Sequence, residues 1–166
     1  MAELRIAWFA LAAAVTAACD RAGAQPAVSS GLAPPAGWQP LPELVAAVTA
    51  AAVAPKASVL GAEAWGETSR GCYAVWIAIQ GGPSTTDHVL AGLAGASIAT
   101  GNVVKPTTPD GVVSATFSRG DYHGHVRARI AGSEAGARVT ALACFANQRE
   151  PAICERACAP LLGAFK

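Results

Sequence analysis

Residues 121–130 alternate between apolar and polar positions more regularly than any other part of the chain. Every second residue from Tyr122 to Ile130 is apolar or glycine, and the intervening residues are Asp121, His123, His125, Arg127 and Arg129. A period of two is typical of a strand with two unlike faces. Shorter β-patterns at 57–67, 112–117 and 138–145 predict three further strands. The last two flank 121–130, which indicates a late antiparallel meander.

One further segment, Cys72 to Ile79, is almost continuously apolar. Such a run predicts a central strand that is covered on both faces. Trp76 lies within it and is expected in the core. Trp38 and Trp65 are expected at core edges, with a ligand cleft as the alternative.

Three segments are predicted to be helical. Residues 42–53 repeat apolar side chains at helical spacing, and Pro55 ends the pattern. Residues 85–98 follow a capping pattern at Ser84. The last helix begins at Pro151, with a buried stripe at Ile153, Ala157 and Leu161, and Pro160 is expected to kink or shorten it. The resulting order, α-β-β-α-β-β-β-α, predicts an α+β sandwich: a single antiparallel-rich sheet flanked by helices.

The length, charge and composition of the chain indicate a single folded domain and argue against a nucleic-acid-binding protein. The chain has 166 residues, enough for one domain with a core. Its 12 basic and 11 acidic residues give a net charge of +1, which provides no electrostatic basis for nucleic-acid binding. A hydrophobic content of 52% excludes a disordered chain.

The N-terminal segment is predicted to be an export signal. Residues 6–18 carry no charge, a run that is too short to span a bilayer. Thr16-Ala17-Ala18-Cys19 resembles the lipobox of bacterial lipoproteins, which implies a signal peptide at 1–18 and an acylated Cys19. Members of that family usually carry Leu, Val or Ile where this chain has Thr16. The alternative is an ordinary secretory signal, cut after Ala18 or near Ala24.

Residues 19–37 follow the signal and are rich in Ala, Gly, Pro and Ser. This composition predicts a flexible tether, and we expect the globular α+β domain to occupy 38–166.

Four cysteines remain in the expected domain: Cys72, Cys144, Cys154 and Cys158. In an exported protein they predict two disulfides, for which three pairings are possible. Cys154 and Cys158 share one face of the last helix, which favours bonds from helix to sheet without choosing between the two such pairings. The spacing is a poor match to a zinc site.

The candidate binding residues lie on the polar face of 121–130: His123, His125, Arg127 and Arg129. Ser114, Thr116 and Ser118 are expected to share this face, together with Arg138 or Thr140 from the next strand. Arginine and histidine side chains suit an acidic partner, a carboxylate or a phosphate. The alternative is the solvated face of a half-buried sheet. A metal site at Asp121, His123 and His125 is disfavoured, because these residues span about 13 Å along a strand.

The order of elements and the late meander resemble the PsbP-like domains, including the DcrB-like bacterial lipoproteins. The resemblance covers 38–166 and rests on element order without a sequence motif. It implies an α/β sandwich used in envelope or complex assembly, usually without catalysis.

The sequence therefore predicts a non-catalytic lipoprotein of the bacterial cell envelope that faces the periplasm or the exterior. We expect it to bind an envelope protein complex, to reach the membrane through its lipid anchor, and to need no cofactor. Two alternatives remain. One is a solute- or lipid-binding module with a pocket between sheet and helices; the other is a metal-assisted hydrolase.

Overall fold

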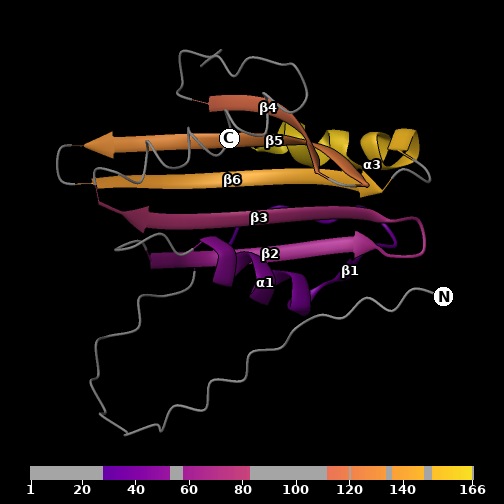
Figure 1. Cartoon of the computed structure of the whole chain (residues 1–166), viewed down its shortest axis with the longest axis horizontal. Coiled ribbons are helices and arrows are strands. Elements are labelled where there is room, and N and C mark those ends of the chain that lie inside the picture. Colours follow the sequence, from indigo (N-terminus) through magenta and orange to yellow (C-terminus); the bar gives the residue numbers. More distant parts are fainter. Residues whose placement is uncertain are drawn as a thin grey trace, which may run out of the picture.

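The strand-forming patterns of the sequence meet in one six-stranded antiparallel sheet, ordered β1-β2-β3-β6-β5-β4 (Figure 1). The computed structural model describes residues 28–52, 58–82, 112–119, 121–133, 136–147 and 151–165. The strands are β1 (Gln39–Pro40), β2 (Ser58–Glu67), β3 (Cys72–Gly81), β4 (Val112–Arg119), β5 (Tyr122–Ser133) and β6 (Gly136–Asn147). The two described helices are α1 (Pro42–Ala52) and α3 (Pro151–Ala164).

The antiparallel sheet and its accompanying helices confirm the predicted α+β class. The continuously apolar segment becomes β3, which pairs with β2 on one side and β6 on the other. Strand β1 is a two-residue addition that no hydrophobic pattern signals. The predicted helix at 85–98 lies outside the described residues, as do the signal segment and Cys19. Neither described helix is long and apolar enough to cross a membrane.

Successive residues of β3 point to opposite faces of the sheet, and the two faces carry different helices. Cys72 is bonded to α3, so the even-numbered residues of β3 and β6 define the α3 face. Tyr73 points the other way, toward α1. There the Leu41 side chain reaches over Gly66, so that a Cβ atom at Gly66 would lie 2.8 Å from Leu41 Cδ1. Figure 1 shows the two helices on opposite sides of the sheet.

Two disulfides fasten α3 to the two central strands. Cys72 of β3 is bonded to Cys154, and Cys144 of β6 is bonded to Cys158, with Cα–Cα distances of 5.2 and 6.0 Å. Both distances lie in the usual range for a disulfide. The expected helix-to-sheet bonding is thus confirmed, and the structure selects one of the two such pairings that the sequence left open.

The core of the α3 face surrounds these disulfides. Trp38, Trp65 and Trp76 are all buried there, together with Leu161 and Phe165. The fully buried residues of α3 are Cys154, Cys158 and Leu161. Of the predicted stripe, Leu161 is thus buried, whereas Ile153 and Ala157 are half-buried, with Ala157 packed against the core. Pro160 neither stops nor shortens α3, which continues to Ala164. It is exposed, so water can reach the backbone where its missing N–H leaves a carbonyl unpaired.

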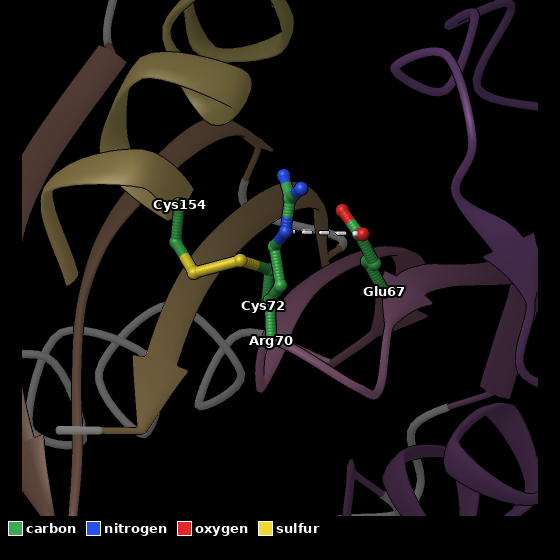
Figure 2. Close-up of polar contacts among 4 residues, drawn as sticks. All are labelled: Glu67, Arg70, Cys72 and Cys154. Carbon is green, nitrogen blue, oxygen red and sulfur yellow. Dashed lines mark ion pairs between the residues drawn. A yellow bond between two sulfur atoms is a disulfide. The ribbon is translucent and has the colours of Figure 1, made fainter. Parts of the chain in front are cut away.

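The turn between β2 and β3 sets the position of Cys72. Gly71 adopts a φ of +68°, a conformation that favours glycine, and its carbonyl accepts a hydrogen bond of 3.0 Å from the Asn147 amide. Arg70 reaches back to Glu67 with an Nε–Oε1 distance of 3.3 Å, beside the Cys72–Cys154 disulfide (Figure 2). The arginine is half exposed, so this ion pair adds little stability. The turn instead matters because it joins β2, β3 and the end of β6 at the cysteine.

The face opposite α3 carries an aromatic row that crosses four strands. Tyr73, Phe145, Gly124 and Phe117 occupy consecutive register positions on β3, β6, β5 and β4. A Cβ atom at Gly124 would lie 2.6 Å from Phe145 Cβ and 2.9 Å from Phe117 Cζ. The two phenylalanine rings therefore close over the glycine, with centroids 6.1 Å apart.

Residues 28–33, which we call the strap, run over β2 on the α3 face. The Val28 amide donates a 2.9 Å hydrogen bond to the Leu60 carbonyl, and Gly61 leaves room for the Val28 backbone. Glu63 accepts hydrogen bonds from the Ser29 hydroxyl (2.8 Å), the Ser30 amide (2.9 Å) and the Ser30 hydroxyl. The sequence predicts a flexible tether at 19–37, but within that range Val28, Ser29 and Ser30 are hydrogen-bonded to β2. Residues 20–27 separate them from Cys19.

The hydrogen bonds from Ser29 and Ser30 to Glu63, which we call the latch, are expected to be acid-sensitive. Burial raises the pKa of Glu63, but the hydrogen bonds from Ser30 and Ser29 outweigh burial and hold the pKa below its ordinary value. A carboxyl with a lower pKa in the folded state adds stability above its unfolded-state pKa. That stability is lost as the pH falls through the folded-state pKa.

We therefore expect Glu63→Gln to lower the free energy of unfolding by about 1–2 kcal/mol at pH 7. Denaturant unfolding at pH 7 and pH 3 should show a smaller acid-induced loss in this variant than in the unmodified protein. Glu43→Gln, at an exposed carboxylate on α1, provides the control. An equal acid-induced loss in the unmodified protein and in Glu63→Gln would contradict the latch.

Candidate functional site

The four candidate binding residues of β5 lie on the α3 face. His125 is paired with Cys144 of β6, and His123 with Ala146, so both histidines share the face of the Cys144–Cys158 disulfide. Arg127 and Arg129 follow on the same face. The register also brings to this face the neighbouring polar residues that the sequence indicated: Ser114, Thr116, Ser118, Arg138 and Thr140.

The face is neither fully solvated nor fully covered. His123 and His125 are exposed, whereas Arg127 and Arg129 are half-buried. The difference follows from the position of α3, which packs on β6, β3 and β5. The four residues thus separate into an exposed histidine half and an arginine half under the C-terminal part of the helix.

Arg127 holds the C-terminal end of α3. Its Nη1 donates a 2.6 Å hydrogen bond to the Leu162 carbonyl, two residues before the helix ends. Carbonyls in the last turn lack partners within the helix and carry its partial negative charge, so a guanidinium stabilises them. Arg127 therefore has a structural role that the sequence alone did not indicate.

The two histidines line a hollow between β5 and α3, which we call the histidine hollow. Its volume is about 250 Å³. Glu155 enters from α3, and its Oε1 lies 3.9 Å from His125 Nε2. Both side chains remain accessible, with exposed fractions of 47% for His125 and 64% for Glu155. The rest of the lining is largely apolar and includes Ala146, Leu162 and three of the disulfide cysteines.

The side chains around the histidine hollow are suited to forming hydrogen bonds with a bound partner rather than to coordinating a metal ion. The rim combines imidazoles, which donate and accept hydrogen bonds, with a carboxylate that only accepts when ionised. In the part of the chain that the structure describes, no three His, Cys, Asp or Glu side chains are grouped as metal ligands. Asp121 is exposed at the turn before β5.

Glu155 is the site residue that sequence reasoning missed. It directly follows Cys154 and precedes Cys158 by three positions, so the disulfides bring it over β5. The cysteine spacing contains the information that places Glu155 near His125. That information predicts the contact only when Cys158 is known to bond to Cys144, the register partner of His125.

The chain matches none of the protein-family models, curated proteins or solved structures with which it was compared. The functional argument therefore rests on the geometry of the site.

Arg127 provides a test of how α3 is held. We expect Arg127→Gln to weaken the bond to the Leu162 carbonyl and to lower the free energy of unfolding by about 1–3 kcal/mol. Backbone amide exchange should increase in the last turn of α3. The control is Arg156→Gln, because Arg156 is exposed on the same helix and donates within it, to the Ala152 carbonyl. Unchanged exchange of the 161–164 amides in Arg127→Gln would rule out this role.

Proposed function

We propose that the protein is a non-catalytic lipoprotein of the bacterial cell envelope that acts as an interaction or assembly module. The observation that carries the proposal is the exposed rim of the histidine hollow, formed by His123, His125 and Glu155 above a floor that two disulfides hold in place. The partner binds in this hollow.

The chemistry of the hollow favours a protein segment with mixed character. Protein interfaces commonly have an apolar centre and a polar rim. The histidine hollow has the same organisation on a small scale, with Ala146, Leu162 and the disulfide cysteines inside and the three polar side chains outside. A projecting loop with an apolar side chain at its tip and polar neighbours would satisfy both parts.

The fastening of α3 supports a docking role, because a preorganised surface pays less conformational entropy on binding. One wall of the hollow is β5 and the other is α3, and the Cys144–Cys158 disulfide joins α3 to the strand beside β5. The Arg127–Leu162 hydrogen bond adds a direct connection between the two walls.

The proposed lipid anchor would keep this surface close to the membrane. Eight residues, 20–27, separate Cys19 from the strap. Fully extended, they reach at most about 29 Å. The partner that fits this geometry is a membrane protein or a complex assembled at the membrane surface.

Site-specific photocrosslinking in the full-length protein within intact envelopes tests the proposal. A benzophenone amino acid replaces His125 in one variant and Gln39 in the control, because Gln39 is exposed on β1 at the opposite edge of the sheet. We expect one dominant protein adduct at position 125 and none at position 39. Adding Glu155→Ala should reduce the adduct about tenfold, while adding Arg156→Ala, its exposed neighbour, should leave it unchanged.

Two results would overturn the proposal. One is the same set of adducts at positions 125 and 39, which would indicate random collisions. The other is a dominant adduct at position 125 that Glu155→Ala does not weaken, which would move the partner away from the histidine hollow.

A further inference from the structure

A second cavity lies on the α3 face, beneath the strap, and we call it the strap cavity. Its volume is about 710 Å³, within the range of ordinary small-molecule sites. It shares no lining residue with the histidine hollow. A function of the strap cavity is therefore separable from the proposed docking function.

Three parts of the fold enclose the strap cavity. The strap forms one wall, and Val28 and Leu32 from it pack against the core. The C-terminal end of α3 forms the other wall, with Leu161 and Phe165. Trp76 of β3 contributes to the floor, and Ala33, Pro160 and Ala164 add further apolar surface beside the polar Ser29, Ser30 and Thr140. A long, flexible hydrocarbon suits such a surface because it gains from burial without needing hydrogen bonds.

No charged residue lines the strap cavity itself, but two arginines lie on the same sheet face close to Thr140. Thr140 lines the cavity, and the register places Arg129 of β5 directly opposite it. Arg138 lies two residues before Thr140 on β6, so it projects from the same face. On the strap side, the Glu63 carboxylate accepts three hydrogen bonds from Ser29 and Ser30. Guanidinium groups bind carboxylate and phosphate oxygens in paired hydrogen bonds.

We propose that the strap cavity binds an anionic amphiphile, with its acyl chain against Trp76 and Phe165 and its head group toward Arg129 and Arg138. The head group is a carboxylate or a phosphate, which a free fatty acid or a membrane phospholipid would supply. The strap is the wall that would move to admit the acyl chain, because the opposite wall is fixed by the disulfides of α3.

Photocrosslinking of the full-length protein in its own envelope tests this inference as well. A benzophenone amino acid replaces Ala164, which lines the strap cavity, or Ala152, which is exposed on the same helix and lines neither cavity. Intact-mass analysis should find a lipid adduct at position 164 and only background at position 152. The adduct mass distinguishes a fatty acid from a phospholipid.

Charge variants then test the head-group assignment. Arg129→Gln combined with Arg138→Gln should reduce the lipid adduct at position 164 by about tenfold or more. Arg138→Glu alone keeps the test decisive if the double variant does not fold, because Arg138 is exposed and its replacement leaves the core intact. Arg138→Lys, which retains the charge, should preserve most of the adduct.

Three outcomes would overturn the inference. Lipid adducts of equal yield at positions 164 and 152 would show only that the protein lies near a membrane. A protein adduct at position 164 in place of lipid would make the cavity part of a protein interface. A lipid adduct that persists in Arg138→Glu would show that the arginines do not bind an anionic head group. None of these results bears on the crosslinks at position 125, so the two sites succeed or fail independently.

Discussion

Cys154 and Cys158 lie one helical turn apart on α3, and their partners lie on adjacent strands, β3 and β6. This pair of bonds holds the helix across the centre of the sheet, with one cysteine committed to each strand. The Cys72–Cys154 disulfide joins residues 82 positions apart in the sequence, and the Cys144–Cys158 disulfide joins residues 14 positions apart. Closing a long loop restricts the unfolded chain most, so in the chain-entropy account the Cys72–Cys154 bridge contributes more stability.

The placement of α3 divides one sheet face into two separate cavities. On the β5 side, the helix leaves His123 and His125 exposed and adds Glu155, which creates the histidine hollow. Near its C-terminal end, Leu161 and Phe165 face the strap across the second cavity. Arg127 lies between these regions and bonds the helix end directly to β5. A shift of α3 would therefore alter both cavities together, so both proposed sites depend on how this helix is fastened.

The strands could be predicted from the sequence because the period of two and the apolar run at 72–79 are local signals. The identity of the helix-covered face could not, because polar residues on β5 look the same whether they face water or a helix. The strap was missed for a similar reason. Its composition is that of a tether, and its order depends on contacts with Glu63 and Leu60, which are distant in sequence. On α3, Cys154 and Cys158 are more deeply buried than the predicted Ile153 and Ala157, because disulfide bonding as well as hydrophobicity determines which side faces the sheet.

Mass-spectrometric mapping of the disulfides without reduction tests the central claim most directly. Trypsin separates the four cysteines, because cleavage after Arg70, Arg138, Arg149 and Arg156 places each one on a different peptide. The structure predicts that the Cys72 peptide is linked to the Cys154 peptide, and the Cys144 peptide to the Cys158 peptide. Links between Cys72 and Cys158, between Cys154 and Cys158, or free thiols at these positions would contradict the placement of α3 on which both sites depend.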